Sequence, residues 1–434
     1  MAILIPPELI DAIVEHIPDV ASLKSCSLAS PIFRFPCQKR LHHTLKLEFA
    51  GPNSRRPPER TLEAVSRRFE EFPRLAGFIT HLTLEIASPW PQRRGPPPDD
   101  QSAFARRVLN SIARVKKVTI SMIITAGRLG GKASWSSLPP DLGSAVLEWL
   151  AHRGTTEPLQ ELVLRSIKLP DAVPPVIFSA TASLALYACT LEHMPASQQE
   201  ATVQPESAPQ VRVHPRALRR FEAHASWGIV ELLATPRQGH HSHFSALRSL
   251  ALSISNYKGN LEMFPRLCAL SANTLTSLEL WPKLQSISSE SRAFLLQRFT
   301  TTLPCLREVR VMLHDYGLAH YSELATSLWV LQNPFRPALL PRLVQITYSV
   351  SVAHSPNGAG LPPTFESEWL TPHDKFIVDH PTLTSIVWET RSFRSEVPLT
   401  EHQKHQQHER FRKEMQRLMP MTHGKDLLVF RRGD

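Results

Sequence analysis

The chain has 434 residues, of which 42% are hydrophobic and 20% charged, so it can bury a large core in two or three domains or in one long repeat array. Its 38 prolines and 16 glycines indicate many irregular connections and few close turns, which disfavours a nucleotide fold built on glycine-rich loops. The net charge of +10 is spread over short clusters mixed with acids and not interleaved with aromatic residues. A solvated basic surface is therefore favoured over nucleic-acid binding.

Five scattered cysteines without a Cys-x-x-Cys pair fit reduced thiols better than a disulfide framework. The first residues lack the basic region of a secretory signal, and no apolar stretch approaches the ~18 residues that span a membrane. We therefore expect a soluble protein of the cytoplasm or nucleus that has no membrane segment.

The chain opens with a predicted amphipathic helix. Pro6 and Pro7 stand where a first helical turn tolerates proline, and Glu8 complements the positive end of the helix dipole. Aliphatic residues then follow at helical spacing, namely Leu9, Ile10, Ile13, Val14 and Ile17. The pattern predicts a helix that ends at Pro18.

Two more short helices and a strand are predicted next. Residues 19–29 predict a second helix that Pro31 stops, and a third helix is expected from about Cys37 to His42. Residues 44–49 alternate between polar and apolar side chains, which predicts a β-strand. Three short helices make a very small core, so we expect this segment to need a partner or the following domain for stability.

The most informative feature beyond this point is a repeated template: an apolar residue, two others, an apolar residue, one other, and an apolar residue. Nine copies and a weaker tenth recur at roughly 34 residues on average. They are Ile79-Leu82-Leu84, Val115-Val118-Ile120, Leu159-Leu162-Leu164, Leu218-Phe221-Ala223, Leu247-Leu250-Leu252, Leu275-Leu278-Leu280, Leu306-Val309-Val311, Leu343-Ile346-Tyr348 and Leu383-Ile386-Trp388, with a weaker copy at Leu184 and Leu186. Each copy predicts a short, half-buried strand.

Amphipathic helical stretches lie between several of these strands, at residues 102–115, 141–152 and 289–303. Strand followed by helix, repeated, predicts parallel strands with right-handed crossovers that stack into a solenoid. The predicted fold class is therefore α/β, with a small N-terminal three-helix domain followed by an irregular solenoid of parallel strands and outer helices.

The predicted domains are residues 1–45 for the helices, 46–400 for the solenoid and 401–434 for a polar C-terminal helix and tail. Loop insertions are expected near 89–101, 194–215 and 352–363, because these stretches are rich in proline or small polar residues. The polar helix is expected to cap the solenoid.

Sequence motifs for phosphate binding, metal binding or catalysis are weak or missing. Residues 127–134 resemble a phosphate-binding loop, but the first glycine is one residue too close and Ala133 replaces the hydroxyl. His402, His405 and His408 are spaced three apart, so on a helix they drift around the axis and do not share one metal-binding face. No Gly-x-Ser-x-Gly or His-Glu-x-x-His occurs. We expect no enzyme activity, no cofactor and no bound metal.

The opening segment resembles an F-box. The residues that carry the resemblance are Ile5-Pro6-Pro7-Glu8-Leu9-Ile10, Ile13, Ile17, Leu23, Cys26, Ser27, Leu28, Phe33 and Leu41. The residue pattern is similar to that of the F-box-like proteins of mushroom-forming fungi, in which a degenerate leucine-rich repeat array commonly follows the F-box. Here Pro31-Ile32-Phe33 replaces the usual basic residue and Trp.

This resemblance implies that the segment binds a Skp-family adaptor and, through it, a cullin-RING ubiquitin ligase, while the array holds a protein target. The contact candidates carried over from the family are Pro6, Leu9, Ile10, Ile13, Leu23 and Leu28. Alternatively, the same residues only pack as the N-terminal cap of the array. The chain would then be an adaptor-independent repeat scaffold with a decayed F-box. A nucleic-acid-associated protein that uses the basic surface is a third hypothesis.

Overall fold

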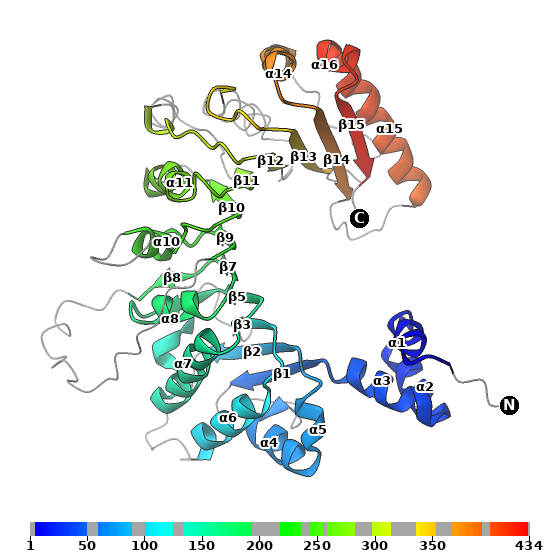
Figure 1. Cartoon of the computed structure of the whole chain (residues 1–434), viewed down its shortest axis with the longest axis vertical. Helices are drawn as coiled ribbons and strands as arrows, with labels where there is room; N and C mark the ends of the chain where they lie inside the picture. Colours follow the sequence, from blue (N-terminus) through cyan, green and yellow to red (C-terminus); the bar gives the residue numbers. More distant parts are fainter. Residues whose placement is uncertain are drawn as a thin grey trace, which may run out of the picture. The chain divides into compact units, whose positions relative to one another are not determined.

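The chain folds into two compact units, Met1–Arg216 and Ala217–Asp434, each with its own layers of helices and strands (Figure 1). The computed structural model describes residues 5–49, 60–88, 100–124, 133–192, 218–235, 243–254, 258–282, 297–313, 336–352, 367–392 and 400–432.

The first unit begins with three helices and continues as a parallel sheet whose strands follow chain order. The opening helices are α1 (Pro7–Glu15), α2 (Val20–Ala29) and α3 (Pro31–Leu41). The sheet contains β1 (Thr44–Phe49), β2 (His81–Ser88), β3 (Lys117–Ile124), β5 (Glu161–Arg165) and β7 (Ser183–Tyr187). The helices along it are α4 (Leu62–Glu71), α5 (Pro73–Ala76), α6 (Asp100–Ser111), α7 (Pro140–Thr155) and α8 (Val173–Ser179).

A second, three-stranded sheet in this unit consists of β4 (Ala133–Ser134), β6 (Ile167–Leu169) and β8 (Thr190–Leu191). A 3-10 turn, η2 (Trp135–Ser137), follows β4.

The second unit repeats the parallel arrangement. Its strands, again in chain order, are β9 (Arg220–His224), β10 (Ser249–Ile254), β11 (Ser277–Pro282), β12 (Glu308–Leu313), β13 (Gln345–Val352), β14 (Ser385–Ser392) and β15 (Leu428–Arg432). Its helices are α10 (Trp227–Ala234), α11 (Lys258–Leu270), α14 (Ser367–Asp379), α15 (Glu401–Leu418) and α16 (Pro420–Gly424).

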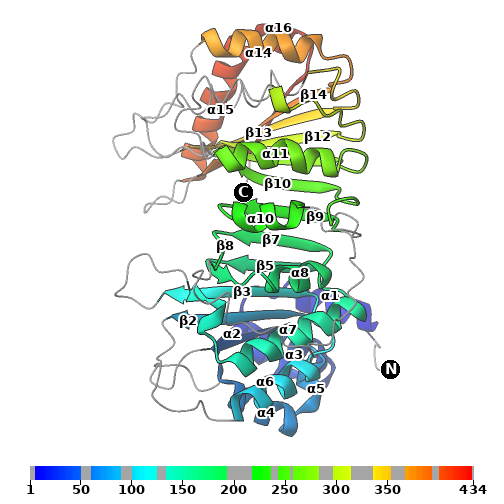
Figure 2. The same cartoon turned by 90° about the vertical axis from the view of Figure 1, so that its left-hand side faces the viewer.

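The repeated template forms the core because neighbouring strands align it in register. Leu82 pairs with Val118, and Val118 pairs with Leu162; in the second unit Leu250 pairs with Leu278. All five side chains are buried. The helices lie over the face of the sheet that carries these rows, and α6, α7, α10 and α11 face the viewer in Figure 2.

The predicted α/β fold with parallel strands and covering helices is confirmed, and every copy of the template lies at a strand: β2, β3, β5, β7 and β9 to β14. The strand predicted at 44–49 is β1. The short strands β4, β6 and β8 and the last strand β15 were not predicted.

Helix boundaries were predicted less well. The third helix begins at Pro31 and not near Cys37, because proline is well tolerated at a first helical position, where its missing N–H has no intrahelical partner. The first helix ends at Glu15 and not at Pro18. Helix α6 ends at Ser111 and not at Val115.

Several predictions fall on residues whose structure is not described. The expected insertions at 89–101, 194–215 and 352–363 lie almost entirely outside the described residues, as do most of 127–134 and of the helix expected at 289–303.

The polar helix expected at the C-terminal end is α15. A reciprocal pair of hydrogen bonds between Thr400 and Gln403 caps its first turn. Its buried face carries Phe411 and Met415, and Phe411 packs edge-on against Trp388 of β14, with ring centroids 5.7 Å apart. A mostly polar helix is thus attached to the sheet by one apolar stripe.

A buried polar cluster joins β13, α14 and α16. The Tyr348 hydroxyl hydrogen-bonds to Nε2 of His373, and the Tyr348 ring stacks on Trp388 at 4.5 Å. The next residue, Asp374, accepts hydrogen bonds from the backbone N–H groups of Met421 and Thr422 at the start of α16, both at 2.8 Å. Complete burial lowers the pKa of His373 to about 3, so its imidazole stays neutral in the folded state.

No helix within the described ranges is both long enough and apolar enough to cross a bilayer.

Gly154 of α7 lies against the end of α8, where a Cβ would come within 2.8 Å of the Ser179 carbonyl oxygen. We expect Gly154→Ala to destabilise the protein by about 1–3 kcal/mol, because backbone must shift. Gly228 of α10 has open space around it, so Gly228→Ala should be neutral or stabilise by up to about 1 kcal/mol. Thermal unfolding of the two variants provides the comparison, and equal effects would contradict the packing described for α7.

Acid should destabilise the fold through His373. The unfolded state takes up a proton as pH falls below about 6.5, whereas the folded state resists protonation down to about pH 3. Stability contributed by the neutral imidazole is therefore complete above pH 6.5 and is lost as pH falls, by about 2 kcal/mol between pH 7 and pH 4.5.

Urea unfolding at the two pH values measures this loss. His373→Gln should lose less stability over the same interval than the wild type. His402→Gln, at an exposed position on α15, serves as the control and should behave as the wild type does.

Candidate functional site

The three N-terminal helices enclose a small core. Val14 of α1, Leu23 of α2 and Cys37 of α3 are buried in it. Partly buried apolar side chains complete it, namely Ile17, Cys26, Phe33 and Leu41. One residue from each helix is thus fully enclosed, and the remaining apolar side chains need other cover.

The six contact candidates from the sequence divide into two groups. Ile10 and Leu23 are buried, with 8% and 4% of their surface exposed. Pro6, Leu9, Ile13 and Leu28 are exposed, and the exposed fractions of the last three are 56%, 49% and 84%. Leu23 thus belongs to the core of the three helices, Ile10 is buried outside that cluster, and the other four are exposed.

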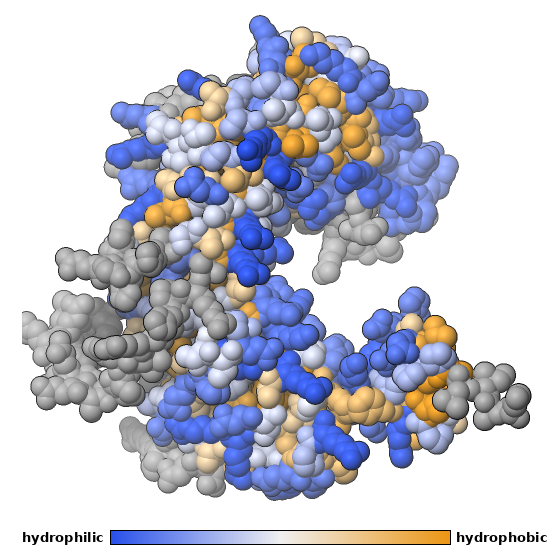
Figure 3. Space-filling view, in the orientation of Figure 1, coloured by the Kyte–Doolittle hydropathy of each residue, from blue (hydrophilic) through white to orange (hydrophobic). Residues whose placement is uncertain are grey.

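The outward-facing group belongs to a larger apolar surface. Ten large hydrophobic side chains are exposed in the described part of the chain, and seven of them lie between residues 5 and 35. We call these seven the apolar surface: Ile5, Leu9, Ile13, Val20, Leu28, Ile32 and Phe35. Orange, hydrophobic atoms gather on α1 to α3 in Figure 3. Such a concentration marks an interaction site far more often than scattered exposed residues do.

The apolar surface arises from the width of the apolar stripe on α1. Ile10 and Val14 are four residues apart and buried, while Leu9 and Ile13, also four apart, lie one residue earlier and are exposed. Two adjacent apolar rows occupy a wider arc than a core of this size can cover.

Helix α2 is held by a well-formed cap. The Asp19 carboxylate accepts hydrogen bonds from the Ser22 N–H at 2.8 Å and from the Ser22 hydroxyl at 2.7 Å. These bonds lower the pKa of Asp19, so it is ionised at neutral pH and favoured at the helix N-terminus. The cap fixes the start of α2, and Leu23 then faces inward while Leu28, five residues on, faces solvent.

The sequence interpretation missed Ile32 and Phe35 because it started the third helix too late. With Pro31 as the first helical residue, Ile32 and Phe35 are three apart on one face, while Phe33 and Cys37 are four apart on another. Two rows, one outward and one inward, could therefore have been found from the sequence alone.

Polar contacts tie α3 to α1. The Arg40 guanidinium, through Nη1, donates a hydrogen bond to the Val14 carbonyl at the end of α1. Nearby, Lys39 lies 4.0 Å from Asp11, with both side chains at least half exposed. The Arg40 bond is the stronger tie, because exposed ion pairs contribute little.

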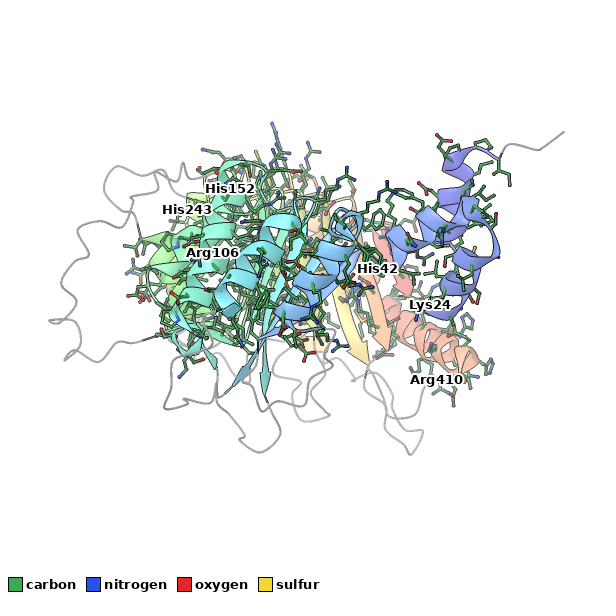
Figure 4. All side chains as sticks on the ribbon, turned by 90° about the horizontal axis from the view of Figure 1, so that it is seen from below. Lys24, His42, Arg106, His152, His243 and Arg410 are labelled. Atoms are coloured by element: carbon green, nitrogen blue, oxygen red, sulfur yellow. The ribbon has the colours of Figure 1, made fainter. Side chains whose placement is uncertain are left out.

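Helix α3 also joins the three helices to the sheet. The Phe35 and Phe78 rings meet edge-on at 5.2 Å, and the His43 carbonyl accepts hydrogen bonds from the N–H groups of Thr80 and His81. His42 lies where α3 leads into β1 (Figure 4). Burial and the charge of Arg68 lower the pKa of His42, so the His42 imidazole is neutral at pH 7.

The Cys37 thiol is a poor nucleophile. Burial, together with the neighbouring Cys26 thiol, raises the pKa of Cys37 to about 11, which keeps it protonated at neutral pH. Across the described ranges no group of three or more His, Cys, Asp or Glu side chains is arranged to hold a metal ion. His402 and His408 instead contact Gln406 and Thr390.

A scan against protein-family models finds no match to the chain, and a search of curated proteins finds no match either.

Loss of the Arg40 tie should loosen the N-terminal helices selectively. We expect Arg40→Ala to destabilise α1 to α3 by about 1–3 kcal/mol, because the Val14 carbonyl loses a charge-assisted hydrogen bond. Lys39→Ala, at the neighbouring exposed position, should cost less than about 0.5 kcal/mol. Amide hydrogen exchange resolves the two effects by residue, and equal loss of protection in both variants would contradict the assigned role of Arg40.

Proposed function

We propose that the chain is the substrate-recognition subunit of a Skp-cullin-F-box type ubiquitin ligase of the cytoplasm or nucleus. Its N-terminal helices bind a Skp-family adaptor, and its leucine-rich-repeat-like array binds a protein target. The subunit itself performs no chemistry, since ubiquitin is transferred by other components of the ligase.

The observation that carries this proposal is the apolar surface on α1 to α3. Leu9, Ile13 and Leu28, which resemble contact positions of an F-box, are all exposed on a three-helix segment. A segment of this size cannot bury both of the apolar rows of α1, and a helical partner protein can cover the second row. The resemblance and the exposure are independent, because one comes from the residue pattern and the other from packing.

The position of these helices in the chain also supports the proposal. They precede the first strand and contact the sheet through Phe35 of α3, which meets Phe78, and through His43, which follows α3. These contacts do not involve α1. An adaptor can therefore approach Leu9 and Ile13 while the strands remain available for a target.

The proposal predicts that Leu9→Asp and Ile13→Asp each abolish capture of a purified Skp-family adaptor. Both positions are about half exposed, so the substitutions should leave the fold intact while placing a charge in the apolar contact. The measurement is a pull-down or calorimetric titration with the full chain, after circular dichroism has shown that the variants are folded.

Phe72→Asp provides the matched control. Phe72 is 58% exposed, close to the 56% of Leu9, but it lies between α4 and α5 and should leave capture unchanged. Failure of the folded wild type to bind the adaptor would overturn the proposal and leave the adaptor-independent scaffold. Equal loss of capture in Phe72→Asp would show that the apolar surface is not the contact.

A further inference from the structure

The turns that precede the strands of the second unit are stacked in a line. One residue from each turn takes part in a chain of backbone hydrogen bonds. The Arg248 N–H donates to the Arg219 carbonyl, the Thr276 N–H to Arg248, the Arg307 N–H to Thr276, the Val344 N–H to Arg307 and the Thr384 N–H to Val344, all at 2.8–2.9 Å. We call these six residues the turn edge.

Side chains reinforce the stacking from one turn to the next. The Thr274 hydroxyl donates to the Leu247 carbonyl at 2.8 Å, and the Thr382 hydroxyl donates to the Leu343 carbonyl at 2.9 Å. The Cys305 thiol lies 3.2 Å from the Asn273 carbonyl oxygen. The turn edge is therefore an ordered row with the spacing of the strands, about 4.8 Å from one residue to the next.

The turn edge carries arginines that form no ion pair with any described residue. Arg219, Arg248 and Arg307 are exposed, and no side chain in the described part of the chain forms an ion pair with them. Arginines on the strands differ: Arg220 lies 3.7 Å from Glu222, and Arg310 lies 3.0 Å from Glu389.

Acidic residues are missing from the turns themselves. The five segments 243–248, 271–276, 299–307, 336–344 and 380–384 contain no Asp or Glu, although Glu308 and Asp379 each adjoin one of them in sequence. In Figure 4 the arrowheads of the strands point down, and His243, in the turn before β10, is labelled on the opposite side. Arginines thus outnumber acids on this rim of the unit, which gives it an excess of positive charge.

The turn edge also contains an exposed apolar side chain. Val344, hydrogen-bonded to Arg307 through the backbone, is 40% exposed, and the described part of this unit has one other large exposed hydrophobic residue, Met421. Phe244 and Phe299, the aromatic residues of these turns, are buried. The edge thus lacks the stacking platforms that single-stranded nucleic acid uses, and it combines cations with one aliphatic contact.

We propose that the turn edge binds an extended acidic segment of a partner protein. Carboxylates of that segment pair with Arg219, Arg248 and Arg307, whose planar guanidinium groups match carboxylate geometry, and an apolar side chain packs on Val344. From Arg219 to Val344 the edge spans four strand spacings, about 19 Å, which an extended peptide of about six residues covers. The inference rests on the proposed function only in naming this partner as the ligase target.

The test is fluorescence anisotropy of the full chain with a labelled peptide of about twelve residues composed of Asp, Glu and Leu, long enough to span the edge. A peptide with Asn and Gln in place of the acids is the uncharged comparison, and a single-stranded oligonucleotide of equal charge tests nucleic acid. The triple variant R219E/R248E/R307E should lose at least about tenfold in affinity for the acidic peptide, and Val344→Asp should also weaken binding.

The matched control is R410E/R412E/K413E on α15, which changes the net charge equally at exposed positions and should alter affinity by less than about twofold. If the charge-reversed edge variant does not fold, the corresponding Arg→Gln triple replaces it, with a loss of at least about threefold expected.

Three results would overturn the inference. The uncharged peptide could bind as tightly as the acidic one, the two triple variants could lose affinity equally, or the oligonucleotide could bind more tightly than the peptide and lose its binding in the edge variant. Adaptor capture is measured on the same proteins. Loss of peptide binding with intact capture in the edge variant separates this inference from the proposed function, and either can fail without the other.

Discussion

The register of the parallel strands is the constraint on which the rest of the structure depends. Because each strand sets its template residues beside those of its neighbour, as Leu250 beside Leu278, the apolar rows form one continuous face in each unit and the helices can all lie over it. The same register aligns the turns at the amino ends of the strands. The line of arginines on the turn edge therefore follows directly from the packing of the core.

The N-terminal helices, in contrast to the sheets, bury few apolar side chains and expose many. Their enclosed core has one side chain from each helix, while seven large apolar side chains remain exposed. Such a segment gains stability from any partner that covers this area, and it is prone to self-association when none does. The contacts of Phe35 to Phe78 and of His43 to Thr80 anchor the segment without covering α1.

The strands were predictable because each one must bury the apolar residues of the same short template, so the pattern can be read locally in the sequence. β15 was missed because Leu428-Val429-Phe430 has the final alternation but no third apolar residue at the template spacing. Proline misled the prediction of the third helix, because Pro31 starts that helix at a first position that tolerates proline, and Pro36 lies inside it.

The candidate site was predictable only in part. Periodicity shows that Leu9, Ile10 and Ile13 are apolar and helical, but it does not show which adjacent row faces the core, since that depends on where α2 and α3 pack. The turn edge was not predictable at all. Arg219, Arg248 and Arg307 are separated by 29 and 59 residues in sequence, and hydrogen bonds between turns bring them into one row.

The last strand has a consequence for aggregation. β15 stands at the end of the strand order, where an unpaired backbone edge invites strands from other molecules. Arg431 and Arg432 are exposed there, and Arg432 is paired with Glu401 of α15 at 3.1 Å. Charge at this edge opposes the pairing of a strand from a second copy, which is one of the ways in which proteins protect a sheet edge.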